Sequence, residues 1–225
     1  MREYELRGVK LALPEALVTP KIRQKLEKGR YEGVEARAAA LRVKPGHRVL
    51  ELGGGMGYVS AICAGITGGE NLVTVEANPD MLPVIRANLD RNGHGAATLI
   101  HGAVAGDAAE GETLAFRRGK AFWGSSIAAE GAGGDIVEVP LLRIGALLRA
   151  HRPQVVIMDI EGAEQHLFDR PWPRHVRSVL MELHPGRYPA TVIRTIFDGM
   201  SASGLTYDPG VSSGAVVGFR RVRGR

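Results

Sequence analysis

The chain has 225 residues, a formal net charge of +5 and a pI near 9.6, with 44% hydrophobic and 24% charged residues. No apolar run approaches the roughly 20 residues that a membrane-spanning helix needs, and the first ten residues, MREYELRGVK, lack the apolar stretch of a secretory signal. The single cysteine, Cys63, excludes an intramolecular disulfide. We therefore expect one globular domain over residues 1–225 in a cytoplasmic setting, with no membrane partner.

Part of the positive charge lies in the terminal segment from Arg220 to Arg225. A nucleic-acid-binding groove usually combines such cations with aromatic side chains on which bases stack. Aromatic residues make up only 5% of this chain. We interpret the segment as a solvated terminus and expect no nucleic-acid partner.

The first 30 residues are predicted to form a segment that covers an edge of the domain. Weak alternation over residues 4–18 predicts one or two small strands. Thr19-Pro20 then has the pattern of an N-cap followed by proline at the first helical position, which predicts a helix over residues 21–27. A second helix is expected over residues 35–41.

The segment from Arg48 to Asn92 has the pattern of half a nucleotide-binding α/β sheet. An apolar strand at residues 49–52 runs into the glycine-rich turn GGGMG. The residues that follow carry the apolar stripe of a helix packed on a sheet, at Val59, Ile62, Cys63 and Ile66. A second strand at residues 72–75 ends at Glu76, where an acidic side chain can accept both hydroxyls of a ribose.

The spacing of the glycines indicates which nucleotide binds. Dinucleotide-binding folds use G-x-G-x-x-G to present a helix N-terminus to a pyrophosphate, but Tyr58 stands where the third glycine would be. Glu51, before the turn, would repel a phosphate and attract a sulfonium. The pattern thus favours S-adenosylmethionine over NAD, with Glu51, Gly53, Gly55, Gly57 and Glu76 as cofactor-binding residues. An ordinary tight strand–helix connection is the simpler alternative.

The alternation of helices and strands continues to the end of the chain, with one interruption. After a helix from Asn78-Pro79 to Asn92, with Leu82, Ile85 and Leu89 inward, the expected elements are strands at 97–100, 155–158, 178–184 and 215–219 and helices at 144–151, 163–168 and 191–203. Within residues 106–139 we expect an inserted flap, with a β-hairpin formed by residues 114–116 and 121–123 and a glycine-rich loop at 131–134.

Ligands of open α/β sheets bind beyond the carboxyl ends of the strands. The third strand leads to Gly102 and Ala103, which we assign to the cofactor pocket together with Ala77. The fourth strand leads to Asp159, Glu161 and Glu164.

Asp159 and Glu161 are expected to face this crevice, because a carboxylate at the end of a buried strand needs a partner or a function. Glu164 is interpreted as a favourable charge in the first turn of a helix. His184, after the fifth strand, either accepts a proton or forms a structural hydrogen bond, and we interpret Glu182, on the same strand face, as a residue that orients its ring. The catalytic candidates are Asp159, Glu161 and His184. No close-spaced ligand motif predicts a metal.

Taken in order, Tyr31-Glu32, ELGGGMG, VEANPD, GAVAGD, MDIEGAEQHLF and LMELHP resemble the FkbM family of S-adenosylmethionine-dependent methyltransferases. The resemblance runs from about Arg30 to Phe219. It implies the class I methyltransferase fold: a Rossmann-like α/β fold with a seven-stranded, mostly parallel sheet, helices on both faces and an antiparallel last strand. It also implies O-methylation of a hydroxyl on a sugar or natural-product small molecule, and adds Glu32 and Asp159 to the cofactor contacts. Ala77 departs from the family, where proline usually follows the acidic residue.

Two other functions stay open. The high pI motivates RNA methylation, although Asp159-Ile-Glu161-Gly162 is not the Asn/Asp-Pro-Pro-aromatic turn of amino-methylating enzymes and its carboxylates would repel a phosphate backbone. A non-catalytic module that keeps only the fold and the cofactor is the other alternative. The sequence identifies neither the acceptor molecule nor the oligomeric state.

Overall fold

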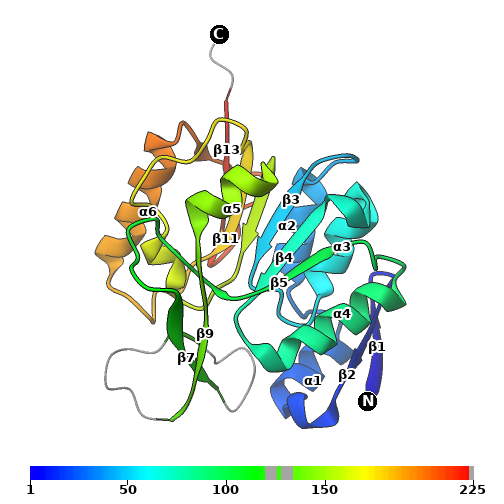
Figure 1. Cartoon of the computed structure of the whole chain (residues 1–225). Coiled ribbons are helices and arrows are strands. Elements are labelled where there is room, and N and C mark those ends of the chain that lie inside the picture. The colour runs from blue at the N-terminus through cyan, green and yellow to red at the C-terminus, as the bar shows by residue number, and fades with distance from the viewer. Residues whose placement is uncertain (120–125, 128–133, 223–225) are drawn as a thin grey trace.

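A computed structural model describes residues 1–119, 126–127 and 134–222 of the chain. Its centre is a seven-stranded sheet in the order β12-β13-β11-β10-β3-β4-β5 (Figure 1). The strands of this sheet are β3 (Val49–Leu52), β4 (Leu72–Glu76), β5 (Thr98–His101), β10 (Val155–Met158), β11 (Ser178–Glu182), β12 (Thr206–Tyr207) and β13 (Val216–Arg220). The helices are α1 (Pro20–Glu27), α2 (Gly33–Arg42), α3 (Tyr58–Thr67), α4 (Leu82–Arg91), α5 (Ile144–His151) and α6 (Ala190–Ala202).

The strand order confirms the predicted fold class. β5, β4, β3, β10 and β11 are parallel neighbours, and β13 lies antiparallel between β11 and β12. This is the seven-stranded, mostly parallel sheet of the class I methyltransferases. The topological switch point, where the strand order reverses, lies between β3 and β10. The ligand-binding crevice of an open α/β sheet is therefore expected at the carboxyl ends of these two strands.

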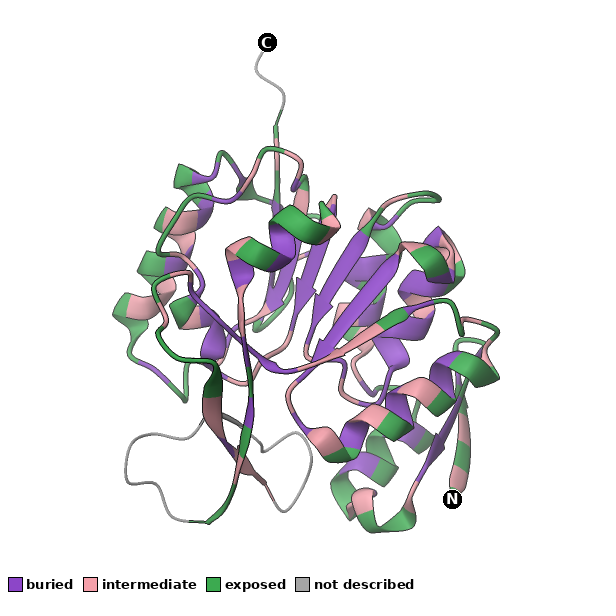
Figure 2. Ribbon diagram, in the orientation of Figure 1, coloured by how far each residue is buried: buried purple, intermediate pink, exposed green. Residues whose placement is uncertain are grey.

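The central strands β3, β4 and β10 are buried on both faces, as Figure 2 shows by their purple colour, whereas the edge strand β5 is only partly buried. Successive residues of β3 point to opposite sides: Val49 packs with α2, α3 and α4, whereas Leu50 and Leu52 pack with α5 and α6. Because both faces are covered, the strands are nearly continuous apolar runs. Such runs made β3, β4 and β10 predictable within one residue of their observed bounds.

The N-terminal strands do not extend the central sheet. β1 (Arg2–Leu6) and β2 (Val9–Leu13) form a separate antiparallel hairpin. Asn88 of α4 holds it in place, since its side chain accepts the backbone N–H of Ala12 at 2.7 Å and donates to the Met56 carbonyl at 2.9 Å. The predicted cover segment therefore lies on α4. The predicted N-cap of α1 is confirmed, with Thr19 accepting the N–H of Ile22.

The insertion is a small β-sheet whose pairing was not predicted. β7 (Thr113–Arg118) pairs antiparallel with β9 (Asp135–Arg143) and with the short β8 (Ser126–Ile127), and the other end of β9 pairs parallel with β6 (Ala103–Ala105). The predicted partner strand at residues 121–123, and most of the glycine-rich loop, lie outside the described residues. β9, missed from the sequence, runs directly into α5, below the central sheet in Figure 1.

Short 3₁₀ turns complete the described chain, at Glu15–Leu17, Gly69–Asn71, Pro79–Met81 and Ala163–His166. The last of these replaces the helix predicted over residues 163–168. Gly162, in a left-handed conformation with φ of 103°, starts this turn and ends the preceding loop. Within the described ranges, none of the helices has the length and apolar composition that crossing a membrane requires.

Candidate functional site

An inner pocket lies at the carboxyl ends of β3, β4, β5 and β10. Most of the predicted cofactor residues line it: Glu32, Gly53, Gly55, Glu76, Ala77, Gly102, Ala103 and Asp159. Side chains that the sequence did not single out complete the walls, including Met81 and Phe116. Phe116 comes from β7, so the insertion contributes directly to this pocket. No sequence pattern could have assigned it there, because the insertion has no recognisable motif.

The glycine turn brings bare backbone into the inner pocket. Gly53 has φ of +85°, in the left-handed region, and a Cβ on it would overlap the carbonyl oxygen of Asp159. Gly55 is also left-handed, with φ of +55°, and a Cβ there would point at the Glu32 carboxylate and the Tyr31 hydroxyl, 3.5 and 3.7 Å away. The turn therefore leaves room for a ligand between β3 and the start of α2.

Glu76 is held at the edge of the inner pocket by backbone donors. Its carboxylate accepts the N–H of Gly55 at 3.0 Å and the N–H of Asn78 at 2.7 Å. Burial raises the pKa of Glu76, and these backbone hydrogen bonds partly offset that effect. A carboxylate has about four acceptor positions, so two remain for the hydroxyls of a ribose.

Two predicted cofactor residues do not line the inner pocket. Glu51 is 2% exposed and accepts the hydroxyl of Ser60, on the face of the sheet that α3 covers. Alternation along β3 turns its side chain away from the ligand. Burial raises the pKa of Glu51 to about 7, against the lowering effect of hydrogen bonds from Ser60 and Thr74. Gly57 starts α3 and packs against Ile85. Glu51 therefore does not line the inner pocket, and the prediction that its charge attracts the cofactor's sulfonium stays a prediction.

Tyr31 and Glu32 close the inner pocket on the side of α2. Glu32 stands in a left-handed conformation with φ of 43° directly before α2. Burial raises the pKa of its carboxyl group well above its ordinary value, with Asp159 adding a repulsion and the Tyr31 hydroxyl opposing the rise. Within the described residues Glu32 forms no ion pair, and a cationic ligand beside its carboxyl group would favour the charged form.

A second, outer pocket of about 580 Å³ adjoins the inner one. Tyr31, Glu32, Asp159 and Glu161 line both pockets, and we call these four residues the shared wall. The outer pocket continues over α1 and α2 and includes Glu182 and His184. Its volume lies in the range of small-molecule sites. All three predicted catalytic residues thus lie in the outer pocket, and two of them in the shared wall.

His184 is surrounded by carboxylates. Its Nδ1 lies 3.0 Å from an oxygen of Glu164, and its Nε2 lies 3.4 Å from Asp159 and 3.7 Å from Glu161. Burial lowers the pKa of His184, but the neighbouring carboxylates of Asp159 and Glu164 outweigh burial and raise it to about 10. In this arrangement His184 is a cation at neutral pH, which does not fit its predicted role as a proton acceptor.

Glu164 has a larger role than the predicted one at a helix end. Its side chain is completely buried, and its carboxylate accepts the Tyr188 hydroxyl at 2.6 Å and the Gly162 N–H at 2.9 Å besides contacting His184. Tyr188 in turn accepts the backbone N–H of His184. This network fixes the orientation of the imidazole ring. Tyr188 was not singled out from the sequence, where a tyrosine six residues after a strand has no signature.

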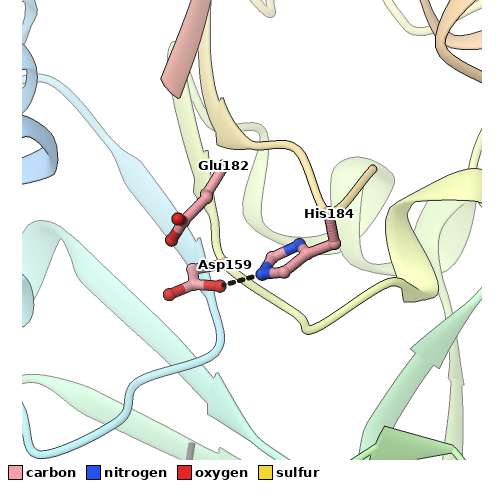
Figure 3. A group of neighbouring side chains, drawn as sticks. All are labelled: Asp159, Glu182 and His184. Atoms are coloured by element: carbon pink, nitrogen blue, oxygen red, sulfur yellow. Dashed lines mark ion pairs between the residues drawn. The ribbon is translucent and has the colours of Figure 1, made fainter. Parts of the chain in front are cut away.

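Two further carboxylates face the same space. Burial raises the pKa of Glu182 to about 7, with repulsion from Asp159 as the next cause. Burial and Asp159 also raise the pKa of Glu161, which accepts a hydrogen bond from Arg187 at 3.2 Å. Figure 3 shows Asp159, Glu182 and His184 converging from two neighbouring strands. Although no metal was predicted, this group offers three ligand atoms within 4.8 Å of one another.

The comparisons with known proteins match part of the sequence and most of the fold. A family model described as protein-L-isoaspartate(D-aspartate) O-methyltransferase matches residues 34–112. A protein-L-isoaspartate O-methyltransferase of Methanococcoides burtonii is 37% identical over 62 residues, which are 27% of this chain and 30% of that protein. The match therefore spans less than a third of the length of that relative.

Among solved structures, Trm5b from Pyrococcus abyssi aligns with a TM-score of 0.53 and 13% identity over 97% of this chain and 55% of that one. Precorrin-6y C5,15-methyltransferase from Geobacter metallireducens aligns with a TM-score of 0.48 and 14% identity over 94% of both chains. At such identities the likeness concerns the fold.

The chain has the fold of the S-adenosylmethionine-dependent methyltransferases, and the matches support the predictions of a methyltransferase and of its cofactor. They do not show the FkbM family. The matched segment, residues 34–112, contains the glycine turn and Glu76 but none of the carboxylates at the ends of β10 and β11. The family match therefore covers the part of the chain with the glycine turn and Glu76, and the carboxylates at the ends of β10 and β11 lie outside it.

Proposed function

We propose that this chain is an S-adenosylmethionine-dependent O-methyltransferase that methylates a hydroxyl group of a sugar or natural-product small molecule. The observation that carries the proposal is the shared wall. It separates an inner pocket, lined by the glycine turn and Glu76, from an outer pocket of small-molecule size, and two of its residues are carboxylates at the end of β10. Methyl transfer requires two ligands in contact, and these pockets meet where that contact would be made.

The residues of the inner pocket fit the cofactor. The space beside Gly55, where the nearest side-chain atoms to a Cβ would be 3.5 Å away or more, accepts the amino-acid end, and Glu76 accepts the ribose hydroxyls. The carboxylate of Glu32 gives a negative field at the shared wall, where the sulfonium would lie. Bound S-adenosylmethionine supplies an electrophilic methyl group, and the acceptor oxygen forms the new C–O bond as the C–S bond breaks.

The residues of the shared wall receive the proton of the acceptor hydroxyl. Asp159 and Glu161 are the two carboxylates at the end of β10 that line both pockets, so either lies beside an acceptor that reaches the methyl group. His184 positions Asp159 through its Nε2 contact at 3.4 Å. General bases of this kind contribute roughly 10²- to 10⁴-fold in rate. Positioning the two ligands supplies the rest of the rate enhancement, because the methyl donor is already activated.

The opposite side of the outer pocket is basic. Arg7, Lys21, Lys25 and Arg30 line it, all exposed, and within the described part of the chain none of them forms an ion pair. An acceptor with an anionic substituent would place that group at this basic side and its hydroxyl at the shared wall. This arrangement favours small acids or phosphorylated sugars among hydroxyl acceptors.

The test is methyl transfer from isotopically labelled S-adenosylmethionine to metabolite extracts, read by mass spectrometry. We expect a labelled product that is lost with the double substitution of Asp159→Asn and Glu161→Gln, while calorimetry shows binding of S-adenosylhomocysteine within about threefold of wild type. Failure of the wild-type protein to bind S-adenosylhomocysteine would contradict the proposal. Binding without any labelled product would instead favour a non-catalytic module.

The family match favours a second candidate, methylation of an isoaspartyl carboxyl group in peptides. The four carboxylates Glu32, Asp159, Glu161 and Glu182 in the outer pocket oppose it, since they would repel a carboxylate acceptor. A synthetic isoaspartyl peptide distinguishes the two candidates. We expect no transfer to this peptide, and turnover on it would replace the proposed acceptor class. Methylation of RNA has no comparable observation in its favour.

A further inference from the structure

We propose that Asp159, Glu182 and His184 bind one divalent metal cation in the outer pocket, with Mn²⁺ or Mg²⁺ as the kind of ion. Asp159 follows the end of β10, Glu182 ends β11, and His184 lies two residues further on (Figure 3). One ligand atom from each lies within 4.8 Å of the other two. Atoms that share an ion at about 2.1 Å are about 3 to 4.2 Å apart, so small side-chain adjustments would complete the site.

The histidine is oriented as metal ligands are. A ligating imidazole usually donates its second ring N–H to a carboxylate, which fixes its tautomer and direction. Here Nδ1 of His184 lies 3.0 Å from Glu164, whose side chain is completely buried and is itself held by the Tyr188 hydroxyl. Nε2 is left to face Asp159 and the outer pocket. Glu164 and Tyr188 thus orient His184 in the way that neighbouring residues orient the histidine ligand of a metal.

The two carboxylates lack a sufficient partner. Oδ1 of Asp159 is a buried atom without a hydrogen-bond partner, and its nearest cationic atom is Nε2 of His184 at 3.4 Å. Among the described residues, Glu182 forms no ion pair, and Arg187 is engaged with Glu161. Buried polar atoms in native proteins normally have a partner, and an unexplained one points to a missing ion or water.

The position of the site suggests its use. The three ligands lie in the outer pocket, and Asp159 also belongs to the shared wall. Three protein ligands leave open positions on the ion, which oxygens of an acceptor can occupy. Carboxylate oxygens with one imidazole suit Mn²⁺ and accommodate Mg²⁺.

A bound ion would displace the proton from Nε2 of His184 and lower the pKa of a coordinated hydroxyl. Asp159 would then act as a ligand, and Glu161, which does not bind the ion, would remain the proton acceptor of the shared wall. This use in catalysis rests on the proposed function, whereas binding of the ion does not.

Binding of Mn²⁺ to the metal-free protein, followed by electron paramagnetic resonance at neutral pH, tests the site directly. We expect one Mn²⁺ per chain, and a loss of affinity of about tenfold or more for Glu182→Gln and for Asp159→Asn. Glu161→Gln is the matched control: it removes a charge equally close to His184 but no ligand, so its affinity should stay within about threefold of wild type. Circular dichroism and S-adenosylhomocysteine binding check that each variant is folded.

The outcomes separate ligation from attraction by a negative surface. Equal weakening in all three variants would mean a diffuse electrostatic effect and would overturn the proposal. So would the absence of Mn²⁺ binding to the wild-type protein at millimolar concentrations. If Asp159→Asn does not fold, Glu182→Gln alone decides, since within the described residues Glu182 forms no ion pair and its side-chain hydrogen bond is with Asp159 itself. None of these measurements depends on methyl transfer.

Discussion

Replacing Glu51 by glutamine is expected to make the protein more stable than wild type at alkaline pH. Glu51 is 2% exposed, and burial raises its pKa from 4.5 to about 7. The folded protein therefore keeps a proton on this group up to about pH 7, whereas the unfolded chain releases it near pH 4.5. The free energy of unfolding contributed by Glu51 falls as the pH rises through this interval, because the unfolded state binds fewer protons.

The interval from 4.5 to 7 corresponds to about 3 kcal/mol at 1.36 kcal/mol per pKa unit. Because glutamine does not titrate, the difference in unfolding free energy between Glu51→Gln and wild type should shift in favour of the variant by roughly 2.5 kcal/mol between pH 5 and pH 8.5. Urea denaturation at both pH values measures this difference. Glu15→Gln, at an exposed carboxylate, is the control and should show no such shift. The same difference at pH 5 and pH 8.5 for Glu51→Gln would refute the reasoning.

Gly53→Ala should weaken S-adenosylhomocysteine binding about tenfold or more in calorimetry, because left-handed strain of about 1–2 kcal/mol is joined by overlap with the neighbouring strand end. Gly46→Ala has a similar positive φ with no atom nearby, so it should leave the affinity within about twofold; equal effects would disprove the steric argument. Tyr188→Phe should lower the free energy of unfolding by about 1–3 kcal/mol, since it leaves a buried carboxylate short of a donor, and an unchanged urea midpoint would contradict this. Asp208→Asn, which breaks the 2.6 Å ion pair with Arg42, should cost about 1–2 kcal/mol at pH 7. That cost should shrink below the ordinary pKa of aspartate, because pairing with Arg42 lowers the pKa of Asp208; a cost independent of pH would argue against the pairing.

Local chemistry made the cofactor half of the fold predictable. The strand at residues 49–52, the glycine turn and Glu76 each follow from a short-range rule, and the structure places Gly53, Gly55 and Glu76 in one pocket. The absence of Glu51 from the lining of this pocket has a simple cause. Its distance from the turn is right, but alternation along β3 directs its side chain to the other face of the sheet.

The arrangement of side chains at the ends of β10 and β11 depends on contacts that no local pattern encodes. The stripe of charges at the end of β10 indicated a site, but the hydrogen bonds of Glu164 with Tyr188 and His184 join residues twenty or more positions apart. Likewise, the sequence of β9 has no clear strand pattern. Four of its nine residues are exposed, and Pro140 lacks the backbone N–H that a strand residue donates. Its pairing with β7 and β6 arises from tertiary structure and leaves no local pattern in the sequence.

The shared wall has a consequence for the order of events in a reaction cycle. Since Tyr31, Glu32, Asp159 and Glu161 border both pockets, the occupant of one alters the surface that the other offers. Such coupling is reciprocal: if the donor tightens the hold on the acceptor, the acceptor slows the escape of the donor to the same thermodynamic extent. Spent donor that lingers in its pocket would then compete with renewal of the cycle, and product inhibition becomes a property of the architecture rather than of any one residue.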